Sequence, residues 1–310
     1  MTLLLWLVGA LLIALLLLYS LFPDRLVALM RALLRVRGGM RRRMVSVDGR
    51  SWPYLEGGNP AKPTLLLVHG FGADKDHWPM IARYLKHDYH LIAPDLPGFG
   101  DNERSTTIAY DIAAQTARLK AFVDALGLKR PHIAGNSMGG WIALRYALDY
   151  PAGLGALILL DSAGVRGEGQ SLLEELAADE SYNPLVLANL EDAERLVALV
   201  VHKPPYMLPR LKPAFYAKAL RYRDQLDHIF WIIARENRDQ PLNDRLGEVR
   251  APTLILWGRH DQVIDASCVP VLEQGIANSQ SHIFEDVGHV PMIEAPRATA
   301  GAMHAFLAAL

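Results

Sequence analysis

The stretch Gly135-Asn136-Ser137-Met138-Gly139 decides the fold of this 310-residue chain. It follows a short apolar run at 132–134 and precedes a stretch with the apolar spacing of a helix. A serine between glycines in a strand–turn–helix context is typical of a strained turn that lifts the hydroxyl out of a sheet. The following helix adds N–H groups and the positive end of its dipole. We therefore expect Ser137 to be a nucleophile; the alternative is a glycine-rich packing turn.

From Met44 onwards the sequence alternates between strand-like and helix-like stretches. Short apolar runs predict buried parallel strands at 64–68, 90–93, 132–134, 156–160, 253–257 and 282–284. Helical stretches separate most of these runs, at about 77–87, 110–127, 139–149 and 296–309. Two earlier runs, 44–47 and 51–55, are joined by Asp48-Gly49 and predict an opening antiparallel hairpin. This alternation predicts an α/β class of fold.

One interval breaks the alternation. Residues 165–245 lie between the fourth and fifth of these apolar runs and carry no strand signal. They contain helical patterns and a proline-rich break at 203–209. A structureless loop of this length is uncommon inside a compact domain. We therefore expect a helical cap, inserted after the sixth strand when the hairpin is counted.

A serine nucleophile needs a general base beside it, and His289 has the required placement. It follows the last predicted strand on a loop that leaves the carboxyl edge of the sheet, where open α/β sheets place their sites. Asp261 follows the preceding strand at the same edge and would fix the tautomer of the imidazole. Two other acids compete for that role: Asp161, directly after the sixth strand, and Asp265. We favour Asp261 because it has the tighter strand–turn spacing.

The oxyanion of an acyl-transfer reaction needs two hydrogen-bond donors. We expect one to be the backbone N–H of Met138, the residue after the nucleophile. The second should come from the loop after the third strand, His69-Gly70-Phe71-Gly72, with the N–H of Phe71 as donor. For His69 itself we favour a loop-shaping hydrogen bond. The sequence has no P-loop, dinucleotide fingerprint or Cys/His metal spacing, so we expect no cofactor and no metal.

The N-terminal segment is apolar. Residues 1–23 contain no charged side chain, and at about 1.5 Å per residue they can cross a hydrocarbon core of about 30 Å. A cleavable signal peptide would begin with positive charge and end in a small-x-small site, whereas 19–22 reads Tyr-Ser-Leu-Phe. A buried core helix does not fit the length and leucine content. We therefore expect a retained transmembrane anchor.

A basic amphipathic helix is predicted at 24–37. One helical face collects its apolar residues, Leu26, Leu29, Met30, Leu33 and Leu34, and three arginines lie off that face. Seven arginines and one aspartate give residues 1–43 a net charge of +6, and the remainder carries −7. A basic block beyond an apolar run points to a membrane surface. Periodicity leaves two positions open for the helix: against lipid headgroups, or packed on its own domain.

Composition sets further limits. An apolar fraction of 51% suits a substantial core for one large domain with an insertion. The overall charge of −1 gives no reason to expect nucleic acid as a partner. Cys268 is the single cysteine, so an intrachain disulfide is impossible, and we expect it to be a small buried apolar side chain.

Taken together, these residues resemble the α/β-hydrolase superfamily from about Met44 to the C-terminus. The chain order Ser137, Asp261, His289 is the order of that superfamily. The resemblance implies an eight-stranded, mostly parallel sheet with helices on both faces and a cap after strand 6. We expect the anchor and juxtamembrane helix at 1–37, the first part of the core at 38–164, the cap at 165–245 and the rest of the core at 246–310.

A narrower similarity is to membrane-anchored monoacylglycerol lipases and to bacterial membrane-bound phospholipase A or lysophospholipase enzymes. The stretches that carry it are the apolar N-terminus, 69–72, 75–78, 135–140, 257–265, 288–289 and 294–297. This similarity implies a serine ester hydrolase that cleaves acyl lipids through an acyl-enzyme. Aromatic residues of the cap could line an acyl channel or simply pack in the cap core: Tyr206, Phe215, Tyr216, Phe230 and Trp231.

Two other functions stay open. The stretch 135–140 also resembles soluble C–C hydrolases that cleave aromatic ring-fission products and share the triad order and cap. A non-catalytic ligand-binding member of the fold is the third alternative, and the intact triad argues against it.

The expected partners are the bilayer, an acyl-lipid substrate and its fatty acid product. The resemblance implies the bacterial inner membrane, with the catalytic domain on the periplasmic side, whereas the arginines after the anchor favour the cytoplasmic side. Ala10 and Ala14, with Gly9 beside them, form a small-residue face in the leucine-rich helix. Such a face allows close helix–helix approach, which predicts a homodimer through residues 1–37.

Overall fold

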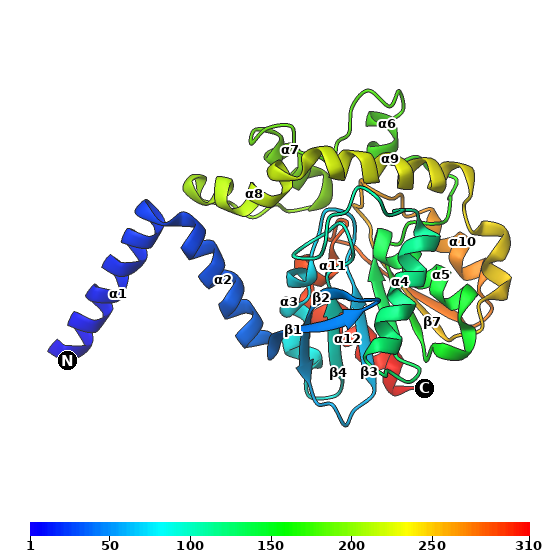
Figure 1. Ribbon diagram of the computed structural model, residues 1–310, viewed down its shortest axis with the longest axis horizontal. Helices are drawn as coiled ribbons and strands as arrows, with labels where there is room; N and C mark the ends of the chain where they lie inside the picture. The colour runs from blue at the N-terminus through cyan, green and yellow to red at the C-terminus, as the bar shows by residue number, and fades with distance from the viewer.

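The computed structural model describes residues 1–310 and is built around one eight-stranded sheet (Figure 1). The strands are β1 (Met40–Val47), β2 (Arg50–Gly58), β3 (Thr64–Val68), β4 (His90–Pro94), β5 (His132–Asn136), β6 (Leu157–Leu160), β7 (Thr253–Gly258) and β8 (Ser279–Phe284). Their order across the sheet is β1-β2-β4-β3-β5-β6-β7-β8. β1 pairs antiparallel with β2 and β2 antiparallel with β4, whereas all other pairs are parallel. The predicted mostly parallel sheet is confirmed.

Helices cover both faces of the sheet, as predicted. One face carries α3 (Pro79–Leu85), α11 (Pro291–Glu294) and α12 (Pro296–Ala308), and the other carries α4 (Ile112–Ala125), α5 (Met138–Asp149) and α10 (Cys268–Gly275). The short 3₁₀ helices η1 (Lys75–His77) and η2 (Pro151–Gly153) lie in loops. A separate hydrophobic cluster fills each side, with Trp141 and Phe122 in one and Trp78 and Met303 in the other. The central strands are apolar on both sides because both faces are covered.

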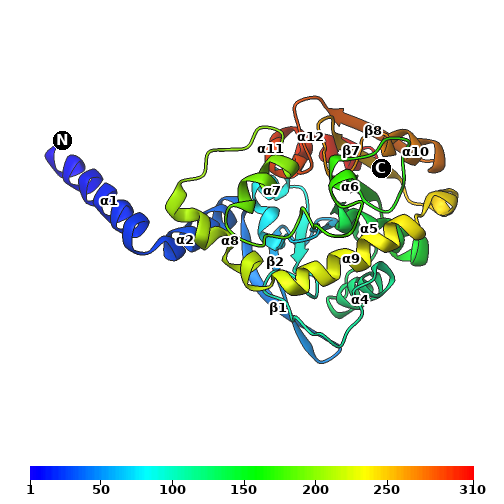
Figure 2. The same cartoon turned by 90° about the horizontal axis from the view of Figure 1, so that it is seen from above.

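A helical insertion follows β6. It comprises α6 (Leu172–Leu176), α7 (Asp192–Val200), η3 (Pro209–Leu211), α8 (Lys212–Arg221), α9 (Arg223–Asp239) and η4 (Asn243–Glu248). The long helix α9 runs across the top of the core, as Figure 2 shows from above. Its buried residues Ile229 and Ile233 join the core cluster that also contains α4 and α5. This insertion is the expected cap; its limits at 165 and 245 stay predictions.

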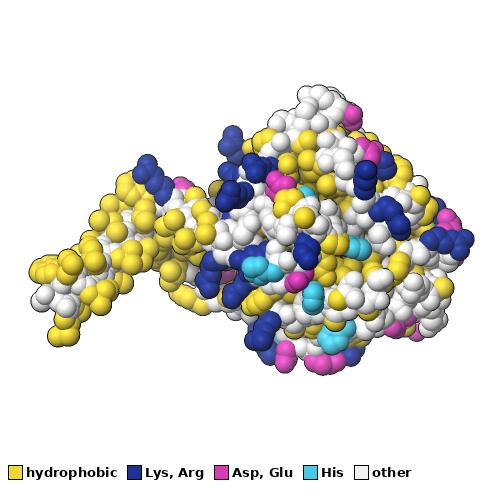
Figure 3. All heavy atoms as spheres, turned by 90° about the horizontal axis from the view of Figure 1, so that it is seen from below, with side chains coloured by type: hydrophobic (Ala, Val, Ile, Leu, Met, Phe, Trp, Pro, Cys, Tyr) yellow, Lys and Arg dark blue, Asp and Glu magenta, His cyan; other side chains and the backbone are white.

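Two helices project from the domain at the N-terminus. In α1 (Thr2–Leu21) no residue is buried, and the apolar side chains stand out along the arm in Figure 3. α2 (Pro23–Gly38) returns to the domain, but Val27 and Gly38 are its only buried residues. Four residues of its leucine-rich face are exposed: Leu29, Met30, Leu33 and Leu34.

Two arginines of α2 pair with carboxylates of the core. Arg35 makes two hydrogen bonds of 2.5 Å to the carboxylate of Asp76, and Arg31 lies 3.6 Å from Asp74. Arg31 also lies over the ring of Phe215 in the cap helix α8. Of the two positions left open by periodicity, the helix does pack on its own domain, whereas four residues of its leucine-rich face stay exposed; a position of that face against lipid headgroups stays a prediction.

Among the differences from the sequence prediction, two concern β1 and α10. β1 begins at Met40, so the basic stretch 41–43 is part of an edge strand with exposed arginine side chains instead of a tail after the helix. Charged side chains on an edge strand are compatible with pairing on one side only. The helix α10 was not predicted, because it has only eight residues and one of them is Pro270.

Candidate active site

Ser137 occupies the turn between β5 and α5 in a strained conformation. Its φ of 56° and ψ of −122° lie in a region that L-residues rarely adopt. The flanking glycines allow the turn: a Cβ on Gly135 would lie 2.1 Å from the carbonyl oxygen of Gly139, and a Cβ on Gly139 would lie 2.3 Å from that of Val68. No other residue type fits these two positions without a shift of the backbone. The predicted strand–turn–helix is therefore present, and its serine stands above the carboxyl end of β5.

His289 and Asp261 form a hydrogen-bonded pair. The Nδ1 atom of His289 lies 2.8 Å from Oδ2 of Asp261, and both residues are buried. The other carboxylate oxygen, Oδ1, accepts hydrogen bonds from the backbone N–H groups of Val263 and Ile264, at 2.8 and 3.0 Å. With Nδ1–H donating to the carboxylate, Nε2 is left as the basic atom of a neutral imidazole.

Neither of the two rival acids is hydrogen-bonded to His289. Asp265 accepts a hydrogen bond from the N–H of Ser267 and makes none with His289. Asp161 is completely buried beside the pair, and its Oδ1 accepts from the N–H of Gly258 at 2.8 Å. Neither replaces Asp261 as the partner of the imidazole.

The loop after β3 lies against the nucleophile. A Cβ on Gly70 would lie 3.0 Å from Cβ of Ser137, so the loop backbone passes directly over the serine. His69 shapes this loop: its Nδ1 donates to the carbonyl of Gly70 and its Nε2 accepts from the N–H of Leu96. Complete burial lowers the pKa of His69 to about 4, which keeps the ring neutral. This agrees with the loop-shaping role expected for it.

Sequence reasoning missed Asn136. Its side-chain amide donates to the carbonyl of Leu160 at 3.1 Å and to that of His289 at 3.0 Å. It therefore ties the serine turn, the end of β6 and the histidine loop together. Its position next to the serine was visible in the sequence, but a contact with a residue 153 positions away was not.

Glu294 holds the histidine loop to the cap. Its Oε1 accepts from the N–H of Gly288 at 3.0 Å, and its Oε2 accepts from the N–H of His202 at 2.8 Å. The N–H of His289 donates in turn to the carbonyl of Val200, at the end of α7. Two of these three hydrogen bonds therefore reach the cap, and the third holds Glu294 to the loop that carries His289.

A buried ion pair lies behind the loop after β3. Lys75 is 1% exposed and donates to Asp95 at 2.5 Å and to Asp101 at 2.8 Å. Asp101 also pairs with Lys218 of the cap helix α8 and with Arg42 of β1. This carboxylate therefore joins the core, the cap and the hairpin.

A cavity of about 550 Å³ opens above Ser137, beneath the cap. Phe71 and Met138 line it together with the serine. Most other lining side chains are apolar, including Leu173, Leu185, Phe230, Trp231 and Ile233. Of the cap aromatics considered, Phe230 and Trp231 line the cavity, whereas Tyr206 and Phe215 are exposed and Tyr216 packs within the cap. A volume of this size is ordinary for a small-molecule site.

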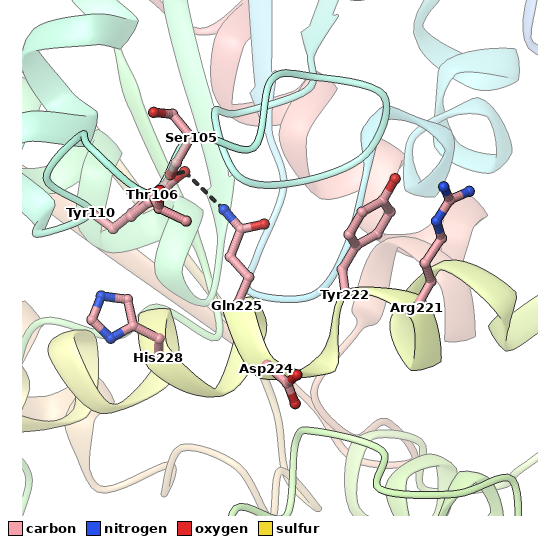
Figure 4. A pocket seen from close by; sticks show the side chains of 8 residues that line it. All are labelled: Ser105, Thr106, Tyr110, Arg221, Tyr222, Asp224, Gln225 and His228. Carbon is pink, nitrogen blue, oxygen red and sulfur yellow. Dashed lines mark hydrogen bonds between the residues drawn. The ribbon is translucent and has the colours of Figure 1, made fainter.

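A second pocket, of about 490 Å³, lies where the cap meets the loop before α4. Figure 4 shows polar side chains around it, with Gln225 of α9 donating to the hydroxyl of Tyr110. It includes none of the predicted catalytic residues.

Cys268 is buried, as expected. Burial raises the pKa of its thiol to about 12, so it stays protonated and unreactive at neutral pH.

Several lipases are similar to this chain in sequence. Lipase 1 of Psychrobacter immobilis is 38% identical over 260 residues, which cover 84% of this chain and 81% of that protein. Monoacylglycerol lipase ABHD6 of Mus musculus is 30% identical over 302 residues, which cover 94% of this chain and 90% of that protein. The similarity to ABHD6 thus extends over most of both chains.

Solved structures agree. A membrane phospholipase A, described as a bacterial virulence factor, is 40% identical with a TM-score of 0.89, over 99% of this chain and 98% of that one. A meta-cleavage product hydrolase from Pseudomonas fluorescens is 24% identical with a TM-score of 0.74, over 86% and 97%, a likeness of fold alone. Residues 65–302 match the model of the protein family described as "Alpha/beta hydrolase family". With its sheet order and its cap after β6, the chain belongs to the alpha/beta hydrolase family.

Proposed function

We propose that this protein is a membrane-anchored carboxylic ester hydrolase that cleaves acyl lipids of the phospholipid, lysophospholipid or monoacylglycerol class. One observation carries the proposal: a strained, cavity-lining serine stands under an apolar cap, and its neighbour Asn136 donates to the carbonyl of His289, which belongs to a buried Asp–His pair. The lipases and the membrane phospholipase A to which the chain is similar support the lipid class.

In this mechanism Ser137 attacks the ester carbonyl while Nε2 of His289 takes its proton. Asp261 stabilises the imidazolium that forms and does not itself take the proton. The oxyanion is held by the backbone N–H groups of Phe71 and Met138. His289 then protonates the departing alcohol, and water hydrolyses the acyl-enzyme by the same steps in reverse.

The cavity supports an acyl substrate. Its apolar wall removes a hydrocarbon chain from water, which is favourable by about 25 cal/mol for each Å² buried. Exposed charged residues, among them Arg166 and Glu168, lie at its rim, where a polar headgroup can stay hydrated. An apolar interior with a polar rim fits an amphipathic ester better than a small polar one.

The anchor is α1. Its 20 residues are long and apolar enough to cross a membrane, and none of them is buried in the domain. An exposed helix of this hydropathy is unfavourable in water, because its whole surface is apolar. We propose that it spans the inner membrane of a bacterium and holds the catalytic domain next to its lipid substrate.

The direct test is hydrolysis of a mixed-lipid vesicle preparation by the purified full-length enzyme. Products are resolved by headgroup and chain length, and the Ser137→Ala variant serves as control. We expect free fatty acid from acyl lipids with wild type and none with the variant. Ester hydrolysis that survives in a folded Ser137→Ala variant would overturn the site; hydrolysis of soluble esters but of no lipid would overturn the substrate class.

A further inference from the structure

Asp161 has a combination of features that the mechanism above does not use. It directly follows β6, is 0% exposed, and has a positive φ of 45°. Its Oδ1 accepts the N–H of Gly258, whereas its Oδ2 is buried without a hydrogen-bond partner. Burial of a carboxylate oxygen without a hydrogen-bond partner costs free energy of folding, so the surroundings of Asp161 should show what offsets this cost.

The explanation is the catalytic pair beside it. One carboxylate oxygen of Asp161, one of Asp261 and a ring nitrogen of His289 all lie within 4.8 Å of one another. Two carboxylates this close in a buried site are not both ionised, because their charges repel without water to screen them. One of the two therefore carries a proton.

The hydrogen bonds decide which one. Asp261 accepts two backbone N–H groups and the imidazole Nδ1–H, all of which stabilise its anionic form. Asp161 accepts a single N–H. The charged groups acting on it are the carboxylates of Asp261 and Glu294, and with burial as the main cause they raise the pKa of Asp161 well above its usual value.

We propose that Asp161 is a positioning residue of the catalytic site: it keeps its proton and donates it in a hydrogen bond to the carboxylate of Asp261. This inference rests on the proposed function, since it assigns Asp261 and His289 to the triad. The bond spreads the charge of Asp261 and fixes the orientation of its carboxylate. A carboxylate with this extra donor attracts the Nδ1 proton less strongly. The acidic limb of the kcat/KM profile should therefore lie at a lower pH than it would without this hydrogen bond.

Two variants separate this role from a merely structural one. Asp161→Asn keeps the shape, the acceptor for Gly258 and a neutral N–H donor toward Asp261. Asp161→Ala removes the donor. The measurement is the pH dependence of kcat/KM on a soluble short-chain ester, using the full-length protein in detergent, with unfolding temperature recorded for each variant.

In the alanine variant we expect the acidic limb of the profile to move up by about half a pH unit or more, because Asp261 loses a hydrogen-bond donor and regains its full charge. In the asparagine variant the limb should stay at its wild-type position, a rescue by the conservative substitution. An unmoved limb in Asp161→Ala would mean that Asp161 only supports the fold. A limb that moves down in Asp161→Asn would mean that wild-type Asp161 is ionised, since a negative charge near His289 has then been removed.

An infrared measurement keeps the proposal testable if the alanine variant does not fold. At neutral pH we expect the infrared spectrum of the wild type to contain the carbonyl band of a protonated carboxylic acid. We expect this band to be missing from the spectrum of Asp161→Asn. Identical spectra would overturn the proposal. This measurement does not depend on activity. If Ser137→Ala remained active, the proposed function would fail, while the infrared band would still report the proton on Asp161.

Discussion

At the carboxyl edge of the sheet, Asp261 and His289 are held by short, buried hydrogen bonds, most of them to backbone groups of the adjoining loops. At the N-terminal arm, α2 packs against α3, and the side chains of Arg31 and Arg35 pair with carboxylates of the core. The first region positions atoms for chemistry, and its contacts leave little freedom. The second positions a whole helix, and its leucine-rich face has no partner in the chain.

The difference indicates that the two regions have different roles: one positions side chains, and the other positions the domain. A base that must accept a proton from a nucleophile remains effective only if the two groups are displaced by well below about 1 Å. A membrane anchor only has to keep the domain near the lipid surface, so a few side-chain ion pairs are adequate. Substitutions at the catalytic edge should therefore change rates with little effect on location, and changes to the arm should do the opposite.

The largest effect is expected at the acid. Asp261→Asn removes the anion that orients the imidazole, and kcat on a soluble ester should fall about 10⁴-fold. The matched control is Asp265→Asn, only four positions away, which should change kcat by less than about tenfold because this carboxylate makes no contact with His289. A greater loss in Asp265→Asn than in Asp261→Asn would show that the acid has been misassigned.

The next test separates location from chemistry. A chain that begins at Pro23 lacks α1 but keeps α2 and the whole of β1, which a chain beginning at Met44 would cut in half. We expect this shortened protein to stay in the soluble fraction after vesicle flotation and to hydrolyse a soluble ester at a rate near that of the full chain. Flotation of the shortened protein to the same extent as the full chain would place the membrane contact outside α1.

The two regions also differ in how well the sequence predicts them. The placement of Ser137, Asp261 and His289 could be predicted because each lies in a local pattern: the serine lies between glycines after one strand, and Asp261 and His289 follow two others. The parallel sheet then brings the ends of these strands together, so no long-range contact had to be guessed. Asn136 was not identified, and Asp161 was identified only as a rival acid, because their contacts are with residues far along the chain.

The arm was predicted only in outline. Hydropathy was enough to identify α1 as a candidate span, and periodicity identified the amphipathic α2. The direction in which α2 faces depends on Arg35 and Asp76, which are 41 positions apart, and helical periodicity contains no information on such a pair. Similarly, the start of β1 at Met40 depends on pairing with Gly57, which a run of arginines conceals.

A smaller effect is expected from separating α2 from the core. Arg35→Ala removes two charge-assisted hydrogen bonds between side chains that are largely buried, at 14% and 9% exposure, and leaves Asp76 unpaired. We expect a loss of about 1–3 kcal/mol in the free energy of unfolding, with kcat on a soluble ester little changed. Arg37→Ala, on the same helix but exposed, is the control and should cost less than about 0.5 kcal/mol. Equal destabilisation by both variants would mean that the Arg35–Asp76 pair does not hold the helix.

The smallest effect concerns assembly. A Cβ on Gly9 would meet nothing within 4 Å, and Ala10 and Ala14 lie on the same exposed helix. The side of α1 with these small residues is therefore free to meet a second copy in the membrane, where close backbone approach allows van der Waals contact to stabilise a helix pair. The exposed leucine-rich face of α2 could extend the contact beyond the bilayer.

We propose a homodimer that forms through residues 1–37. Cross-linking in detergent should give a dimer for the full chain and a monomer for the chain that begins at Met40, the first residue of β1. Ala10→Ile and Ala14→Ile should weaken the dimer, because a bulky side chain separates the two helices. Leu12→Ile, which alters the same helix without filling the small-residue face, is the matched control and should leave the dimer unchanged. If the chain without residues 1–39 dimerises as strongly as the full chain, the contact lies in the catalytic domain or the cap, and the arm serves only to anchor the protein.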